Sequence, residues 1–172
     1  WCDFCIYAAL AGYFSSLFFP PGNATAAFLA SLATFGAGFL VRPMGALFFG
    51  RMGDRLGRKR TFMATIVLMG VATVGIGLLP SYENIGIAAT VSLVILRLLQ
   101  GFALGGEVGG AVTYVAEHSP TSRRGLYTGC LQITAGAGLL LALAAVYSVK
   151  ELVNEESFRA WGWRIPFIVS LV

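Results

Sequence analysis

The sequence predicts an all-α membrane protein, a bundle of five full transmembrane helices and the beginning of a sixth. Three observations predict this fold class. Of the 172 residues, 57% are hydrophobic and only 12% are charged, with a mean hydropathy of +0.78, which is too apolar for an ordinary soluble domain. Apolar stretches of ~20 residues, the length that crosses a bilayer, recur along the chain. The short segments between them carry most of the charged side chains.

The order of these apolar stretches gives the individual spans. They are expected at residues 1–19, 26–49, 61–79, 87–116 and 125–149, with a sixth beginning at Arg164. Pro20 and Pro21 end the first span, and Pro80 ends the third, since proline interrupts a helix. The fourth span is long enough to tilt or to extend beyond the bilayer.

Residues 50–60, GRMGDRLGRKR, are expected to form a short loop between the second and third spans. This stretch carries five basic side chains and a single acid, Asp54. A charged side chain at the bilayer centre costs ~3 kcal/mol, so the stretch lies outside the hydrocarbon. Clustered Lys and Arg in a short loop also place that loop in the cytoplasm. Residues 117–124 add Arg123 and Arg124 after the fourth span, so both loops are predicted to be cytoplasmic, in a bacterial-type inner membrane.

Other classes of protein fit the composition poorly. The net charge of +4 does not indicate nucleic-acid binding, because the bases lie in loops beside apolar spans. Cys2, Cys5 and Cys130 all lie in apolar surroundings and are expected to be small buried hydrophobic residues. We therefore expect no enzyme activity, no metal site and no bound cofactor. The chain begins at Trp1 and ends at Val172 within an apolar run, so both ends are expected to be cuts in a larger transporter.

Charged residues within the spans are the first candidates for function, because a charge in lipid must pair, face water or bind a ligand. They are Asp3, Arg42, Arg97 and Glu107. On the second span, a stripe of small and polar residues with helical spacing is predicted to line a lumen; its members are Thr34, Gly38, Arg42, Gly45 and Phe49. The alternative to a lumen-lining role is that the side chain of Arg42 extends to the cytoplasmic lipid headgroups.

On the fourth span, Arg97, Gln100 and Glu107 lie toward one side of the helix and are expected to face a common cavity. Arg97 and Glu107 are ten residues apart, or ~15 Å along the axis, too far for a direct ion pair. A carboxylate in a medium of low dielectric constant binds a proton readily, so Glu107 or Asp3 is a candidate proton carrier. The alternative to a proton-carrying role is that the acid, Glu107 or Asp3, belongs to a static ion pair within the membrane. Glycines at four-residue spacing on the same span indicate close helix packing.

The fifth span and the segment after it carry further candidates. Thr128 and Gln132 share a face of the helix and are expected either to bind a substrate or to join helices by hydrogen bonds. Trp161 and Trp163 are expected to lie in an interfacial belt on the outer side.

Two motifs resemble those of the major facilitator superfamily. The first is Gly50-x-x-x-Asp54-Arg55-x-Gly57-Arg58-Lys59, between the second and third spans, and the second is Arg97-x-x-Gln100-Gly101 on the fourth. Further stretches are similar to the metabolite:proton symporter branch of that superfamily: residues 38–45, 100–110, 116–120 with Arg124 and Gly125, and 161–167. The opening Trp1-x-Asp3-Phe4 is also similar, although Cys2 stands where that branch has tyrosine.

The resemblance implies a transporter of twelve helices in two six-helix halves that rock about a central site, with residues 1–172 as the N-terminal half. It implies symport of a small organic acid or zwitterionic metabolite with protons, driven by the proton gradient. We expect Arg42 or Arg97 to attract the substrate, with Gln100 and Gln132 beside it, and Glu107 or Asp3 to carry the proton. A membrane sensor without transport, a uniporter and an exchanger are the alternatives.

The resemblance also implies an inner gate at the cytoplasmic loops. In it, Arg58 reaches Glu117 while Asp54 faces a helix of the other half. The motif residues Gly50, Arg55, Gly57, Lys59 and Arg124 complete this gate. The alternative is that these charges only set the topology.

Overall fold

The computed structural model describes residues 2–20 and 22–169, and the side chains of this part from Phe4 onward. These residues are almost entirely helical and contain no strand. The elements are α1 (Cys2–Phe18), α2 (Ala24–Leu56), α3 (Arg58–Leu78), α4 (Tyr82–Ile85), α5 (Ile87–His118), the 3₁₀ helix η1 (Thr121–Arg123), α6 (Arg124–Leu152), α7 (Glu155–Ser157), the π-helix η2 (Phe158–Gly162) and α8 (Arg164–Val169).

The long helices confirm the predicted membrane fold. Within the described residues, α2, α3, α5 and the continuous helical segment Thr121–Leu152 are each long and apolar enough to cross a bilayer. The apolar helix α1 is shorter, and α8 is the described beginning of the sixth. Every span predicted from the sequence therefore coincides with a helix.

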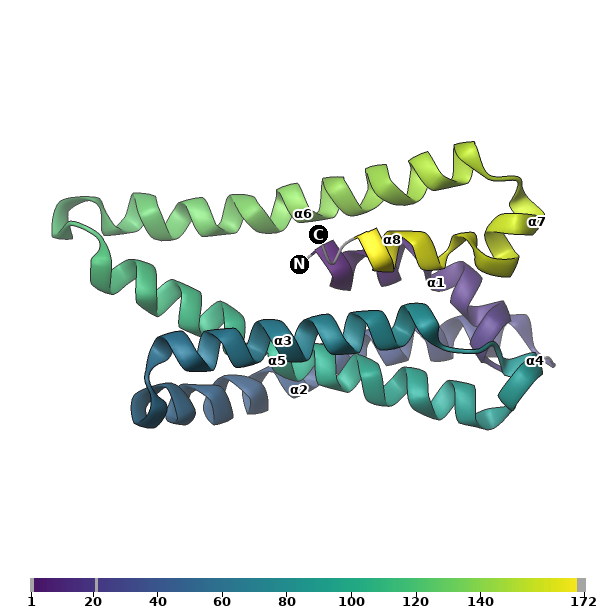
Figure 1. Ribbon diagram of the computed structural model, residues 1–172, viewed down its shortest axis with the longest axis horizontal. Helices are drawn as coiled ribbons and strands as arrows, with labels where there is room; N and C mark the ends of the chain where they lie inside the picture. The colour runs from purple at the N-terminus through teal and green to yellow at the C-terminus, as the bar shows by residue number, and fades with distance from the viewer. Residues whose placement is uncertain (1, 21, 170–172) are drawn as a thin grey trace.

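The helices form two groups joined by α1. Helix α5 packs along α2 and α3, whereas α1 packs against both α2 and α6 (Figure 1). The α2–α3 turn and the α5–α6 connection lie at one end of the bundle, and α4 and α7 lie at the other. We call the first end the basic end. Seven of the twelve bases lie there: Arg51, Arg55, Arg58, Lys59, Arg60, Arg123 and Arg124.

The prediction of a loop over residues 50–60 was wrong. Helix α2 continues to Leu56, and Gly57 is the one residue between it and α3. At 33 residues, α2 is ~50 Å long and exceeds the ~30 Å hydrocarbon core, so its charged final turns can remain helical outside the lipid. Gly57 has φ 91°, a backbone conformation that glycine adopts without strain. Residues 117–124 are likewise not a simple loop, because α5 reaches His118 and α6 begins at Arg124.

The polar stripe on α2 also differs from its prediction. Thr34, Gly38, Gly45 and Phe49 are buried, with Gly38 and Gly45 against α5, so most of this stripe forms a helix-packing seam rather than a lumen wall. Only Arg42 retains partial exposure.

Glycines make the seam between α2 and α5 possible. A Cβ atom added at Gly101 would overlap the backbone of Gly38, and one at Gly105 would overlap the carbonyl of Arg42. A Cβ at Gly45 would overlap the carbonyl of Phe102. The predicted close packing is thus confirmed for these glycines of α5, whereas space is open at Gly109, Gly110, Gly125 and Gly129.

An aromatic core closes the end opposite to the basic end. Trp163 is 1% exposed and packs edge-on against Phe14 and Phe18. Its predicted place in an interfacial belt was therefore wrong, although Trp161 is 52% exposed. The guanidinium of Arg164 donates a hydrogen bond of 3.1 Å to the carbonyl of Leu79, which ties α8 to the C-terminal end of α3.

Candidate functional site

Arg97 lies at the centre of a buried polar network between the helices. Its side chain is fully buried, and its Nη1 donates a hydrogen bond of 2.6 Å to Oε1 of Gln100. The guanidinium carbon lies 3.8 Å from the centre of the Tyr7 ring of α1, within the range of a cation–π contact. Neighbours on two helices therefore fix the position of this charge.

The network continues from Gln100 and Tyr7 to two more helices. Nε2 of Gln100 donates a hydrogen bond of 2.7 Å to the hydroxyl of Thr73 on α3. The hydroxyl of Tyr7 donates to the carbonyl of Ser31 on α2 at 3.2 Å, and the Ser31 hydroxyl donates back to the carbonyl of Ala11. Gln100 thus contacts α3 and holds Arg97, while Tyr7 joins Arg97 to α2.

Arg42 lies close to this network but in a different environment. Its guanidinium carbon is 3.8 Å from the centre of the Phe39 ring and 4.5 Å from that of Phe4. The ring of Phe4 is also 5.8 Å from the guanidinium of Arg97, so one ring borders both charges. Pro43 follows Arg42 within α2. We call these residues the arginine cluster: Phe4, Tyr7, Phe39, Arg42, Thr73, Arg97 and Gln100.

The remaining residues predicted for the membrane site are Asp3, Glu107, Thr128 and Gln132. Glu107 is partly exposed on α5. Gln132 is exposed on α6, and the hydroxyl of Thr128 donates to the carbonyl of Arg124 within its own helix. Asp3 belongs to α1, but its side chain lies outside the described part of the chain. The structure thus brings together the two arginines and Gln100 from the predicted set.

The basic end carries the ion pair expected between Arg58 and Glu117. Nη2 of Arg58 lies 3.0 Å from Oε1 of Glu117, which joins the beginning of α3 to the end of α5. The two side chains are 40% and 49% exposed, so solvent screens the pair, and its contribution to stability is small. Arg124 is the first residue of α6, and Arg55 is exposed on the last turn of α2.

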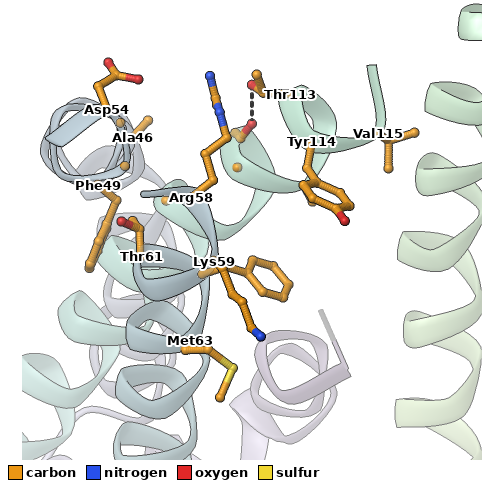
Figure 2. Close-up of a pocket in the computed structure, with 17 residues that line it drawn as sticks. Ala46, Phe49, Asp54, Arg58, Lys59, Thr61, Met63, Thr113, Tyr114 and Val115 are labelled. Carbon is orange, nitrogen blue, oxygen red and sulfur yellow. Dashed lines mark hydrogen bonds between the residues drawn. The ribbon is translucent and has the colours of Figure 1, made fainter. Parts of the chain in front are cut away.

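A cavity of about 920 Å³ lies beside this ion pair, between the end of α2, the beginning of α3 and the last turns of α5. Figure 2 shows Asp54 and Arg58 pointing toward the same open end, while Lys59 and Met63 point the other way. Gly50 and the α5 glycines Gly106, Gly109 and Gly110 also line the cavity. None of the lining residues belongs to the arginine cluster, so the two sites are separate.

No cluster of ligating side chains for a metal ion occurs within residues 2–20 and 22–169.

Four members of the arginine cluster were not predicted as site residues from the sequence: Phe4, Tyr7, Phe39 and Thr73. A signal for Tyr7 was available, because it lies four residues after Asp3, on the same helix face, and carries a hydroxyl in the middle of an apolar span. Thr73 gave no such signal. Its role depends on Gln100 of another helix, and sequence spacing does not reveal contacts between helices.

Comparison with known proteins gives a consistent result over the whole chain. The family model of the sugar (and other) transporters matches residues 5–172. The chain is 46% identical to the shikimate transporter of Escherichia coli (strain K12), over 100% of this chain and 40% of that protein. It is 43% identical to the proline/betaine transporter of Salmonella typhimurium, over 99% of this chain and 34% of that protein. The alpha-ketoglutarate permease of Escherichia coli (strain K12) is 40% identical, over 100% of this chain and 40% of that protein.

Solved structures give the same fold. The inward-open xylose transporter XylE from E. coli superposes with a TM-score of 0.85 at 20% identity, over 98% of this chain and 41% of that one. The proton:xylose symporter XylE bound to 6-bromo-6-deoxy-D-glucose gives a TM-score of 0.87 at 19% identity, over 98% of this chain and 38% of that one. The chain therefore spans about two fifths of the proteins that it resembles in sequence and fold.

Proposed function

The chain belongs to the sugar (and other) transporter family of the major facilitator superfamily, and from this premise we propose that it is the N-terminal half of a proton-coupled symporter. It is an integral protein of the inner membrane, and the relatives compared above are transporters, not enzymes. The proposed solute is a small organic acid or zwitterionic metabolite, as the names of the relatives suggest. Transport proceeds by alternating access, and the proton gradient supplies the energy without a cofactor.

The buried charge of Arg97 is the observation that supports this proposal. Enclosing a guanidinium within an apolar bundle is costly, and charged residues at such positions mark solute and proton pathways. A carboxylate attracted by Arg42 or Arg97, with Gln100 and Gln132 nearby, and a proton on Glu107 or Asp3 together reduce the net charge of the site. Reorientation across the low-dielectric middle of the membrane is then less costly than with either charge alone.

The decisive experiment measures the external pH around liposomes that contain the complete transporter, at zero voltage, after addition of shikimate, 2-oxoglutarate, proline or glycine betaine. Symport predicts alkalinisation with at least one solute, because each solute molecule carries protons inward. Empty liposomes and an added protonophore are the controls. Uptake of labelled solute without alkalinisation would indicate a uniporter or an exchanger, and no flux of any solute would indicate a sensor.

At the basic end, we propose a gate made of Asp54, Arg58 and Glu117, with Gly50, Arg55, Gly57, Lys59 and Arg124 as its structural surroundings. The ion pair between Arg58 and Glu117 supports this role, since it connects the beginning of α3 to the end of α5 at the basic end. Asp54 is exposed at the rim of the cavity. In the proposed gate it faces the other half of the transporter.

We expect Asp54→Asn to reduce the initial rate of uptake about tenfold, equivalent to ~1.4 kcal/mol, because the closed gate loses one charged contact. The rate is measured in liposomes at equal protein content. Glu83→Gln is the matched control, since Glu83 is also exposed but lies in α4 at the opposite end. A full rate with Asp54→Asn would exclude Asp54 from the gate.

A further inference from the structure

A second groove lies along α2 near the basic end, apart from the arginine cluster and from the larger cavity beside Arg58. Its volume is about 820 Å³, and its lining comes from α2 alone. Met44, Leu47 and Phe48 line the part toward the middle of the helix, whereas Arg51 and Arg55 line the part toward its end. All five side chains are exposed. The groove therefore changes from apolar to basic along the helix axis.

The two arginines of this groove have no acidic partner in the part of the chain that the structure describes. They lie one helical turn apart, ~6 Å along the axis. The ion pairs among the described residues join Arg58 to Glu117 and Arg159 to Glu155, and neither involves Arg51 or Arg55. Asp54, the acid nearest in sequence, lines the larger cavity and points toward its open end (Figure 2).

The order of apolar and basic side chains matches an anionic phospholipid. The final turns of α2 lie beyond the hydrocarbon core, so Arg51 and Arg55 are at the level of the headgroups. Met44 lies seven residues before Arg51, ~10 Å deeper, at the level of the acyl chains. Guanidinium groups bind a phosphate through paired N–H donors, and basic clusters beside a membrane helix attract anionic headgroups.

Other ligands and the other cavity suit this chemistry less well. A soluble anion would satisfy the two arginines but leave the apolar part of the groove uncovered, and a neutral lipid would do the reverse. In the larger cavity, Arg58 is already paired with Glu117, and Asp54 at the rim would repel a phosphate. Lys59 points away from Arg58 there (Figure 2).

From these observations we propose that the groove on α2 binds one anionic phospholipid, with its phosphate between Arg51 and Arg55 and an acyl chain along Met44, Leu47 and Phe48. This inference goes beyond the proposed function, because it concerns the surrounding lipid and holds for any transported solute. A lipid held there anchors the end of α2 at the membrane surface.

Native mass spectrometry of the complete transporter, with added dioleoylphosphatidylglycerol or dioleoylphosphatidylcholine, tests the site. We expect phosphatidylglycerol to bind more tightly than phosphatidylcholine. Arg51→Gln combined with Arg55→Gln raises the Kd for phosphatidylglycerol about 10- to 50-fold, since each arginine near an anionic headgroup contributes about fivefold. Arg60→Gln combined with Arg123→Gln is the matched control. It removes the same charge from exposed positions at the basic end that do not line the groove, so the Kd stays within about twofold.

A second double variant, Met44→Ala with Leu47→Ala, distinguishes a lipid from a soluble phosphate. Loss of apolar contact should raise the Kd for phosphatidylglycerol about threefold or more. An unchanged Kd in this variant, together with displacement of the lipid by inorganic phosphate, would assign the groove to a soluble anion and overturn the proposal.

The same spectra identify the other possible occupants of the groove. Equal binding of the two lipids, or an unchanged Kd in the variant that lacks Arg51 and Arg55, would overturn the proposal and indicate that the other half of the transporter covers this face. A dimer of transporters without bound lipid, abolished by the same two substitutions, would assign the groove to a second copy and also overturn it.

Discussion

Replacement of Arg97 by glutamine is expected to reduce solute uptake about 100-fold or more, equivalent to ~3 kcal/mol, while the protein still reaches the membrane. The substitution removes the charge that stacks on Tyr7 and the donor that binds Oε1 of Gln100. Both neighbours are buried, so neither regains a partner from solvent. The uptake of solute and the amount of transporter in the membrane are measured on the same liposomes.

The matched variant Arg97→Lys keeps the positive charge but loses the planar group that stacks on Tyr7 and reaches Gln100. We expect it to recover only a small part of the uptake. Calorimetric binding of the transported acid by Arg97→Gln separates two causes of the lost uptake: weaker binding indicates that Arg97 attracts the solute, and unchanged binding indicates that Arg97 acts by positioning Tyr7 and Gln100. Normal uptake by Arg97→Gln would remove this residue from the transport mechanism.

Gly105→Ala is expected to destabilise the protein by ~1–3 kcal/mol or more, because the added methyl group has no space in the α2–α5 seam. The new Cβ would overlap the carbonyl of Arg42, a backbone atom that moves only with the whole of α2. Loss of stability is measured by thermal unfolding of the purified complete protein, and a lower yield in the membrane should accompany it.

Gly109→Ala is the matched control for this prediction. Gly109 lies on the same helix, four residues later, and nothing lies within 4 Å of a Cβ added there. Alanine favours the helix by ~1 kcal/mol over glycine, so this variant should unfold at the same temperature or slightly higher. Equal unfolding temperatures for the two alanine variants would contradict the tight seam at Gly105.

The positions of the helices could be predicted because hydropathy and length are local properties of the sequence. The third span was expected at residues 61–79 and the helix covers Arg58–Leu78, a difference of a few residues. The exact end of α2 could not be predicted in the same way. Hydropathy marks where the chain leaves the lipid, near Phe49, but arginine and leucine favour helix in water as well, and α2 continues to Leu56.

The candidate site was predicted only in part, because a polar stripe on a helix can face either a lumen or a neighbouring helix. Gly38 and Gly45 were assigned to a lumen, yet they allow α5 to approach. Arg97 and Gln100 share a helix, and their proximity follows from the helical period. Tyr7 and Thr73 come from other helices, so their contacts with Arg97 and Gln100 become visible only in the three-dimensional fold.

The connection through Gly57 has a consequence for biogenesis. A single residue with φ 91° joins two long apolar helices and fixes them as an antiparallel hairpin. A link of one residue is too short to let one helix enter the bilayer while the other remains in the aqueous phase. Helices α2 and α3 are therefore expected to insert together as one unit, with the charged turns around Gly57 retained on the side from which insertion starts.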